Sequence, residues 1–380
     1  MKTMRVAIVH DYLNQMGGAE RVVAVLHELF PEAPIYTTIV DREKLFPELK
    51  DADIRTTWMQ HIPGIFKRFK QFFWLYPFAV RSMDLSGYDL VISSSSAYAK
   101  GVKTGKEATH VCYCYTPMRF AWDFNTYMEG IQVPGTVKKV AKAMVAPLRS
   151  WDVATARGVH HFVAISSVVQ SRIKDFYSRP SSVIYPPVNI SRFSLADVSE
   201  VQDYYLVVSR LVSYKKLDLA VQACSRLGKK LIVIGDGPDR ERLQSMSGPS
   251  VEFKGRLHDE EVVRYMKQCR AFLFPGLEDF GITPLEVNAC GRPVVAFHGG
   301  GALDTIVPGL NGFHFEEHTV ESLAAALERV EKHAWDSQRI RRHAEQFDEK
   351  RFRHELLSFI QNATQQHPAL KQSLAAVADQ

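Results

Sequence analysis

Two carboxylates stand on either side of a short loop that could bind an anion. Glu278 follows the apolar run Ala271–Phe274, which predicts a strand, and Glu286 lies eight residues further along the chain. The loop leads into a predicted helix, whose first N–H groups lack an intrahelical acceptor and attract phosphate. These N–H groups belong to the residues that follow Phe280, namely Gly281, Ile282 and Thr283. Carboxylates around such amides can accept hydrogen bonds from sugar and ribose hydroxyls, so the pattern suits a sugar nucleotide.

Glu286 also has a purely structural interpretation. Thr283 and Pro284 are the residue types expected at a helix N-cap and at the first helical position. Glu286 comes three residues after the threonine, which is the spacing of a capping box. Glu278 has no such alternative, because it lies in the loop beyond a strand, where ligand-facing residues gather. Both roles stay open for Glu286, whereas Glu278 is assigned to the ligand.

Two cations follow another predicted strand. Arg210 lies just beyond the apolar run Tyr205–Val208, and Lys215 precedes the predicted helix Leu217–Arg226. Arginine offers forked N–H donors and lysine a compact charge, so the pair suits a diphosphate. A solvated charged turn is the alternative interpretation of the same residues.

Paired glycines lie between the predicted strand Val6–His10 and the helix after it. Gly17 and Gly18 would let the backbone approach a ligand closely, although a simple turn would use them equally well. Gly235-Asp-Gly237 also follows a strand, but residue 240 is arginine, so the third glycine of a dinucleotide-binding fingerprint is missing. This second motif predicts a strand-to-helix turn and argues against an NAD-dependent dehydrogenase.

The composition places these motifs in a globular protein. The 380 residues are 46% hydrophobic and 23% charged, values that exclude disordered, collagenous and low-complexity chains. A single core stops growing at about 250–300 residues, so two domains are expected. No run approaches the roughly 18–20 apolar residues of a membrane-spanning helix, and residues 1–15 lack the features of a secretory signal. The five cysteines form no disulfide framework, which favours buried thiols and a cytoplasmic location.

Short apolar runs alternate with helix-period segments along nearly the whole chain, which indicates an α/β protein with parallel sheets. Pro186 and Pro187 stiffen an extended stretch that reads as a linker. We therefore expect one α/β domain over residues 1–188 and a second over 189–348. A helix over 349–364 could pack on either domain, and residues 365–380 have the composition of a frayed tail. The clearest predicted strands are Val6–His10, Leu90–Ser93, His110–Tyr115, His161–Ile165, Val183–Tyr185, Tyr205–Val208, Lys230–Ile234, Ala271–Phe274 and Pro293–Phe297.

Two segments combine basic residues with apolar ones and carry no acidic residue. Residues 55–83 hold five Lys or Arg and eight aromatic residues, and residues 131–149 hold Lys138, Lys139, Lys142 and Arg149. Such stretches suit an anionic membrane surface, while a partly buried helix pair with a cationic rim is the alternative. The net charge of +5 is mild, and no helix-turn-helix pattern or zinc spacing accompanies it, so nucleic acid is not an expected partner.

Taken together, these motifs resemble the family-4 glycosyltransferases, which are retaining enzymes of the GT-B fold, and among them bacterial polysaccharide mannosyltransferases. The spacing from Glu278 to Glu286 is similar to the family's E-x7-E element, and residues 209–215 are similar to its Arg/Lys diphosphate element. Gly17–Gly18 resembles its N-terminal glycine loop, and residues 299–304 resemble a later loop. The resemblance covers most of the chain, and the motifs occur in the family's order.

The resemblance implies two Rossmann-like domains that face each other across a cleft, with the nucleotide on the C-terminal domain. Glu286 would bind the ribose, and Glu278 would contact the donor sugar. Arg210 and Lys215 would hold the diphosphate, helped by the amides after Phe280. The base would lie against Gly255, Arg256 and Leu257.

The resemblance also implies a mechanism without a metal or other cofactor. In this fold helix N-termini and cations take the place of the metal. Retention is explained in this family by front-face departure, in which the leaving phosphate takes the acceptor proton. Catalysis is then electrostatic stabilisation and positioning, with little covalent work for a side chain.

One segment departs from the family pattern. Many relatives carry a histidine directly before the Thr-Pro pair at residues 116–117, where this chain has Tyr115. That histidine is usually assigned to the hydroxyls of the donor sugar. Tyr115 could donate a hydrogen bond with a different reach, and Arg119 is a candidate substitute contact to the sugar or the acceptor.

We expect from these residues and this resemblance a metal-independent, retaining hexosyltransferase that acts in exopolysaccharide synthesis. The donor would be a nucleoside diphosphate sugar, with GDP-mannose as the first choice. The acceptor would be a glycan or a polyprenyl-diphosphate-linked glycan at the inner face of the cytoplasmic membrane. The alternatives are a GT-B-fold sugar-nucleotide epimerase or phosphorylase-like enzyme, and a non-catalytic nucleotide-sugar-binding protein.

Overall fold

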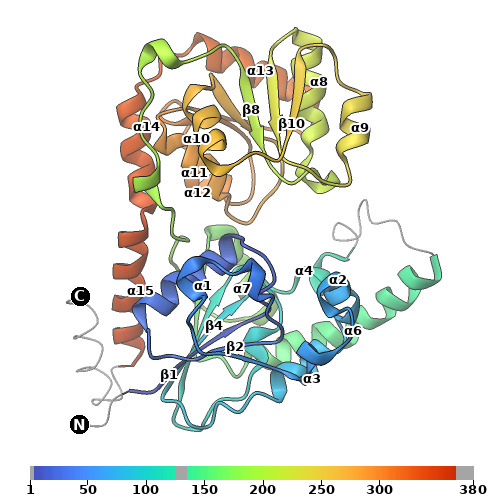
Figure 1. The fold of residues 1–380 in the computed structure, drawn as a ribbon, viewed down its shortest axis with the longest axis vertical. Helices are drawn as coiled ribbons and strands as arrows, with labels where there is room; N and C mark the ends of the chain where they lie inside the picture. The colour runs from blue at the N-terminus through green and yellow to red at the C-terminus, as the bar shows by residue number, and fades with distance from the viewer. Residues whose placement is uncertain (1–3, 125–134, 365–380) are drawn as a thin grey trace. The chain divides into compact units, whose positions relative to one another are not determined.

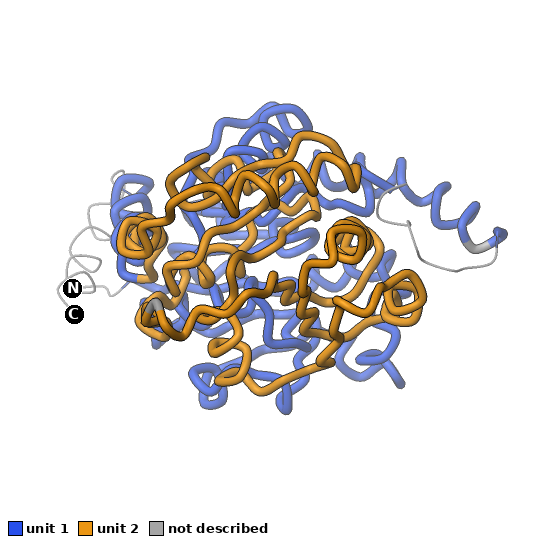
Figure 2. Tube along the Cα trace, turned by 90° about the horizontal axis from the view of Figure 1, so that it is seen from above, with its two compact units in different colours: residues 1–128, 132–187, 350–380 blue, residues 129–131, 188–349 orange. Residues whose placement is uncertain are grey.

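The computed structural model describes residues 4–124 and 135–364, which form two compact units (Figure 2). Unit 1 comprises the described residues up to Pro187 together with those from Lys350 onward, and unit 2 comprises Val188–Glu349. The division falls beside Pro186 and Pro187, in the proline-stiffened stretch. Among the described residues, no helix is both long and apolar enough to cross a membrane.

The sheet of unit 1 has, in the described part of the chain, seven parallel strands in the order β3-β2-β1-β4-β5-β6-β7 (Figure 1). β1, β4 and β5 are buried along their whole length, as expected for strands covered on both faces. The order reverses between β1 and β4, and ligands of open α/β sheets bind beyond the carboxyl ends of strands at such a switch point. The strands are β1 (Val6–His10), β2 (Ile35–Thr37), β3 (Ile54–Thr56), β4 (Leu90–Ser95), β5 (Thr109–Cys114), β6 (His161–Ala164) and β7 (Ser181–Val183).

The helices of unit 1 come from both ends of the chain. The last helix packs on this unit, because Phe352, Leu356 and Ile360 are buried and the ring of Phe352 meets that of Tyr113 edge-on, with centroids 5.6 Å apart. The terminal helix thus belongs to unit 1 apart from its first residue. The α-helices are α1 (Gly18–Leu29), α2 (Ile65–Arg68), α3 (Tyr76–Arg81), α4 (Arg119–Trp122), α6 (Gly135–Ala156), α7 (Ser167–Tyr177) and α15 (Glu349–Ala363).

The sheet of unit 2 has six parallel strands among the described residues, in the order β10-β9-β8-β11-β12-β13. Its switch point lies between β8 and β11, which are neighbours in the sheet. The strands are β8 (Tyr205–Val208), β9 (Leu231–Ile234), β10 (Val251–Gly255), β11 (Ala271–Phe274), β12 (Val294–Phe297) and β13 (Gly312–Phe315). The α-helices are α8 (Leu217–Leu227), α9 (Arg240–Ser245), α10 (Asp259–Gln268), α11 (Ile282–Ala289), α12 (Ala302–Thr305), α13 (Val320–Lys332) and α14 (Ser337–Ala344).

The nine predicted strands are confirmed, and their ends differ from the prediction by no more than two residues. β7 begins two residues earlier than predicted, because polar Ser181 and Ser182 hide its start from an apolar pattern. Four strands were not predicted. β2 and β3 have only three residues each, β10 alternates charged with apolar residues, and β13 contains Gly312 and His314.

Candidate active site

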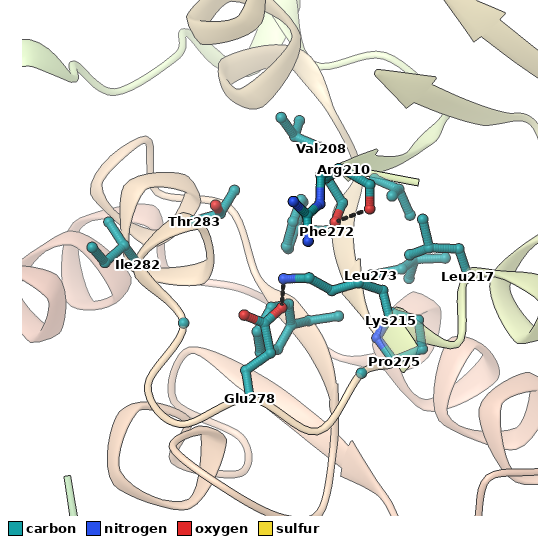
Figure 3. A pocket seen from close by; sticks show the side chains of 15 residues that line it. Val208, Arg210, Lys215, Leu217, Phe272, Leu273, Pro275, Glu278, Ile282 and Thr283 are labelled. Carbon is teal, nitrogen blue, oxygen red and sulfur yellow. Dashed lines mark hydrogen bonds and ion pairs between the residues drawn. The ribbon is translucent and has the colours of Figure 1, made fainter. Parts of the chain in front are cut away.

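A pocket of about 190 Å³ lies at the carboxyl ends of β8 and β11 in unit 2 (Figure 3). These strands flank the switch point of the sheet, where the loops after them diverge and leave space for a ligand. Six of the residues that the sequence singled out line this pocket: Arg210, Lys215, Glu278, Gly281, Ile282 and Thr283. The fold therefore brings the predicted diphosphate cations and the predicted anion-binding loop together.

Lys215 and Glu278 form an ion pair inside the pocket, drawn as a dashed line in Figure 3. Lys215 ends the short 3-10 helix Ser213–Lys215, and Glu278 lies in the loop after β11. The two segments touch at Gly276, where a Cβ would lie 3.0 Å from Lys215 Cα. A glycine suits this point because a side chain there would press on the backbone of the lysine.

Arg210 lies two residues beyond the end of β8, and Figure 3 shows its guanidinium directed toward the same pocket. Its backbone is held by the Gly235–Gly237 turn. A Cβ at Gly235 would lie 1.9 Å from the carbonyl oxygen of Ser209, and one at Gly237 would lie 2.2 Å from that of Leu211. The prediction of a strand-to-helix turn is confirmed, and both glycines are required because the arginine loop packs directly on them.

Helix α11 begins earlier than the sequence predicted. Its N-cap is Gly281 at φ +93°, and Ile282 is the first helical residue, so Thr283 is not the cap. A Cβ at Gly281 would lie 2.8 Å from the ring of Phe274, which explains the glycine. The predicted capping box from Thr283 to Glu286 is therefore wrong, while the N–H groups of the first turn still line the pocket.

Glu286 lies on α11 but does not line the pocket of Lys215 and Glu278. Burial raises the pKa of Glu286 to about 7; Arg192 opposes this shift, and Asp259 adds to it. Arg192 and Asp259 form their own ion pair at 2.9 Å, and the side chain of Glu286 has no hydrogen bond or ion pair to another described residue. With the capping role removed, Glu286 is a half-buried carboxylate without a side-chain partner, on the same helix whose first turn lines the pocket.

The glycine segment Gly299–Gly301 packs against the backbone of the Glu278 loop. The N–H of Gly301 donates to the carbonyl of Glu278 at 2.8 Å, and a Cβ at Gly300 would lie 2.1 Å from that same oxygen. A Cβ at Gly301 would lie 2.2 Å from Cα of Phe280. The Gly299–Gly301 segment therefore positions the carboxylate loop by backbone contact, a role that the sequence motif did not reveal.

The remaining predicted residues of unit 2 lie outside this pocket. Phe280 is 4% exposed, and its ring packs near that of Phe347, so the side chain belongs to the core. The three residues expected near the base lie at the end of β10 and just after it, and none of them lines the pocket. β10 is an edge strand that β9 separates from β8. The three residues are Gly255, Arg256 and Leu257.

The other predicted residues belong to unit 1, near the switch point between β1 and β4. Gly17 is the N-cap of α1 and Gly18 is its first residue. The hydroxyl of Tyr115 donates to the carbonyl of Ala19 at 3.0 Å, so it is tied to the first turn of that helix. Arg119 is the first residue of α4.

Asp11 is a residue that sequence reasoning missed. It follows β1, is 1% exposed, and accepts hydrogen bonds from the N–H groups of residues 96–99 and from the hydroxyl of Ser96, at 2.6–3.0 Å. It thereby fixes the loop after β4 against the end of β1. Its signal in the sequence was an acid immediately after an apolar strand.

No group of three or more His, Cys, Asp or Glu side chains in the described ranges is arranged as ligands for a metal ion. The cationic side of the pocket in unit 2 comes instead from Arg210, Lys215 and the N-terminus of α11. Such an arrangement can stabilise an anion, and Glu278 beside it can accept hydrogen bonds from hydroxyl groups.

Known proteins share both the sequence pattern and the fold. Alpha-1,3/1,6-mannosyltransferase ALG2 of Mus musculus is 25% identical over 83% of this chain and 84% of its own length. A GDP-mannose-dependent alpha-mannosyltransferase of Corynebacterium glutamicum is 33% identical over 32% of this chain and 30% of its own. Among solved structures, Anabaena Alr3699/HepE in complex with UDP superposes with a TM-score of 0.69 at 18% identity, covering 94% of this chain and 100% of that one. The lipopolysaccharide outer core galactosyltransferase WaaB, in its apo form, gives a TM-score of 0.66 at 19% identity, over 94% of this chain and 99% of that one.

Two family models match the two halves of the chain. The one described as Glycosyltransferase Family 4 matches residues 16–192, and the one described as Glycosyl transferases group 1 matches residues 196–347. These matches agree with the two parallel sheets and with the mannosyltransferase relatives, and together they identify the family of the chain. It belongs to glycosyltransferase family 4 and has the GT-B fold.

Proposed function

We propose that this glycosyltransferase moves a hexose, with retention of configuration and without a metal ion, from a nucleoside diphosphate sugar to a glycan acceptor. The observation that carries the proposal is the convergence of Arg210, Lys215 and Glu278 with the first turn of α11 on one pocket. The diphosphate would lie on the two cations and the amides. Glu278 would hold hydroxyls of the donor sugar, and Glu286 those of the ribose.

The chemistry asked of these residues is electrostatic. As the bond between sugar and diphosphate breaks, negative charge collects on the departing phosphate. A guanidinium, an ammonium and helix N-terminal amides that already face that position stabilise the charge without having to reorganise. The departing phosphate would take the acceptor proton, so the mechanism needs no protein side chain as a base.

We propose mannose from GDP-mannose as the donor, because mannosyltransferases recur among the relatives. Two of them are named as GDP-mannose-dependent, from Corynebacterium glutamicum and Mycolicibacterium smegmatis. Solved structures of the same fold hold UDP or UDP-glucose, at 17–18% identity. The identities of the base and of the sugar in the donor are therefore the first properties to test.

The test is binding of GDP, UDP, ADP and dTDP to the purified protein, by calorimetry and thermal shift with a chelator present. We expect one nucleotide to bind with much higher affinity than the others. Its mannose or glucose derivative should then release the nucleotide when an acceptor is supplied. Binding of none of the four would contradict the donor site. Donor turnover that yields an epimerised nucleotide sugar, or that needs phosphate, would instead indicate an epimerase or a phosphorylase-like enzyme.

We also propose that a surface of unit 1 contacts an anionic membrane, where a lipid-linked glycan acceptor would reside. Four of the eight aromatic residues in segment 55–83 are exposed: Trp58, Phe66, Trp74 and Phe78. Exposed Lys67, Arg68 and Lys70 lie among them. Amphipathic surfaces of this kind combine apolar insertion with attraction to anionic lipid.

The first turns of helix α6 would extend the proposed membrane-contacting surface, whereas Arg149 further along the helix would not. Figures 1 and 2 show its first turns extending beyond the rest of unit 1, and these turns carry exposed Lys138, Lys139, Val140 and Lys142. Arg149 has a different role, because it donates two hydrogen bonds to the carbonyl of Ala121 and lies over the ring of Trp122. Residues 131–134 of the predicted segment lie outside the described residues.

A further inference from the structure

The loop before α1 is closed by a buried carboxylate. Glu20 is 2% exposed; its Oε2 accepts a hydrogen bond from the N–H of Gly17 at 3.1 Å, and its Oε1 accepts one from the side-chain amide of Gln15 at 3.0 Å. A Cβ at Gly17 would lie 2.7 Å from that same Oε2. The carboxylate therefore holds the loop against the helix, and its position accounts for the glycine.

Tyr115 reaches the same turn from the end of β5. Its hydroxyl donates to the carbonyl of Ala19 at 3.0 Å and lies 2.8 Å from Oγ of Ser94. Burial raises the pKa of Tyr115 well above its usual value, so the hydroxyl keeps its proton. Because a carbonyl can only accept, the single phenolic proton goes to Ala19, and Ser94 must donate to the tyrosine oxygen.

The chain of hydrogen bonds continues to the end of β1. Nδ1 of His10 lies 3.0 Å from both Oγ and the carbonyl oxygen of Ser94. Because the carbonyl can only accept, Nδ1 carries a proton, and donation runs from His10 through Ser94 and Tyr115 to Ala19. The other ring nitrogen, Nε2, faces Oε1 of Glu20 at 3.9 Å. Side chains from β1, β4 and β5 thus converge on one helical turn.

We propose that Tyr115 is a positioning residue, which together with Glu20 fixes the Gly17–Gly18 turn so that the N–H of Gly18, at the start of α1, can bind an anionic group of the donor. The inference rests on the proposed function. It reverses the expectation that Tyr115 replaces the histidine of relatives as a contact to the sugar, because its only proton is already donated to Ala19.

Two observations connect this turn with a ligand. It lies at the switch point between β1 and β4, where ligands of such sheets bind. Asn14, in the same loop, is 8% exposed, and its Oδ1 has no hydrogen-bond partner among the described residues. A buried polar atom of this kind is expected to be completed by a bound molecule or an ordered water. Pre-ordered donors bind an anion without the cost of ordering the loop first.

The first test is hydrogen–deuterium exchange of the intact protein without ligand. Tyr115→Phe removes only the hydroxyl, and we expect the amides of residues 17–22 to exchange at least tenfold faster. Tyr113→Phe is the matched control, since Tyr113 lies on β5 two residues before Tyr115, is buried, and donates to the carbonyl of Ile184 at 3.0 Å. Equal exchange at residues 17–22 in the two variants would overturn the proposal.

The second test separates positioning from sugar contact by kinetics with GDP-mannose, or with UDP-glucose if the wild type prefers it. We expect Tyr115→Phe and Glu20→Gln each to raise the donor KM three- to tenfold with kcat within twofold, and the double variant to show less than the product of the two effects. A variant that is merely less stable lowers the active fraction, and so kcat, at unchanged KM. A Tyr115→Phe enzyme with altered donor preference and unchanged exchange would show a sugar contact and overturn the proposal.

The two tests also distinguish this inference from the proposed function. Wild-type protein that binds no nucleotide sugar would overturn the proposed function and the ligand part of the inference together. The exchange comparison does not depend on substrate, so it still decides whether Tyr115 holds the turn.

Discussion

The ammonium of Lys215 pairs with the carboxylate of Glu278 although 63 residues separate them along the chain. They come from the loops after β8 and β11, which are neighbours at the switch point of unit 2. The pair holds in one place the two charges that we assign to the diphosphate and to the sugar. A site organised in this way before substrate binds needs little rearrangement when charge develops on the leaving group.

Removal of both cations should abolish transfer while the fold survives. We expect Arg210→Ala with Lys215→Ala to lower kcat/KM at least 100-fold, because loss of one preorganised donor to a developing charge costs about 10²–10³ in rate. The measurement is release of nucleoside diphosphate from the donor, with thermal unfolding as the check on folding. Arg226→Ala is the control, since Arg226 is an exposed cation paired with Glu321 on the helical side of the same unit. Turnover near the wild-type rate in the double variant would contradict the diphosphate assignment.

Glu286 should contribute to nucleotide binding, because the capping role that competed with this function is absent. Glu286→Ala removes both acceptor oxygens, and we expect the affinity for the preferred nucleoside diphosphate to fall about tenfold, the effect of roughly 1.4 kcal/mol from lost hydrogen bonds to a charged group. Glu286→Gln keeps one acceptor oxygen, so its nucleotide affinity should lie between those of the wild type and Glu286→Ala. Calorimetry at pH 8 measures all three, and equal affinities would remove Glu286 from the site.

Ionisation of Glu286 should lower the unfolding free energy of the ligand-free protein as the pH rises. The pKa of Glu286 is raised to about 7, so folding favours the protonated carboxyl, and ionisation opposes folding as the pH rises through 7. Glu286→Gln should therefore match the wild type in unfolding free energy near pH 4, below the pKa of an unfolded glutamate, and exceed it at pH 8. The gain is at most about 3 kcal/mol, from about 1.4 kcal/mol per pKa unit, and solvent screening reduces it. Urea unfolding at the two pH values measures it, with Glu241→Gln, an exposed carboxyl of α9, as control; a difference that does not change with pH would refute the expectation.

The membrane contact that we propose for unit 1 should respond to charge reversal. We expect Lys67→Glu, Arg68→Glu and Lys70→Glu together to reduce sedimentation with phosphatidylserine-containing vesicles at least tenfold, because each basic residue near such a surface is worth about 1 kcal/mol. Lys332→Glu, Arg339→Glu and Arg342→Glu make the same charge change on exposed residues of unit 2 and serve as control. Equal losses in the two triple variants would indicate a general charge effect and no defined membrane surface.

Much of the fold could be predicted from local pattern. Continuous apolar runs such as Ala271–Phe274 mark strands covered on both faces, and the residues just after them mark the edge of the sheet where ligands bind. Their positions just after predicted strands were sufficient to select Arg210 and Glu278 as site residues, and Lys215 was selected from the loop before the next helix. The same reasoning missed β10, because alternating charged and apolar residues on an edge strand leave no apolar run.

Local sequence pattern was sufficient to predict the α/β class, the order of the elements and the charged residues beside them, because these depend on neighbours within a few positions. The start of α11 emerges only in the folded chain, where Gly281 is the N-cap at φ +93° and the ring of Phe274 leaves no room for a side chain there. The tertiary structure also decided that Tyr115 donates to Ala19, a residue 96 positions away. It divided the aromatic residues of segment 55–83 between core and surface, with Tyr76 buried and Phe78 exposed. Each of these outcomes depends on which distant residue the folded chain brings into contact, and no local spacing encodes that.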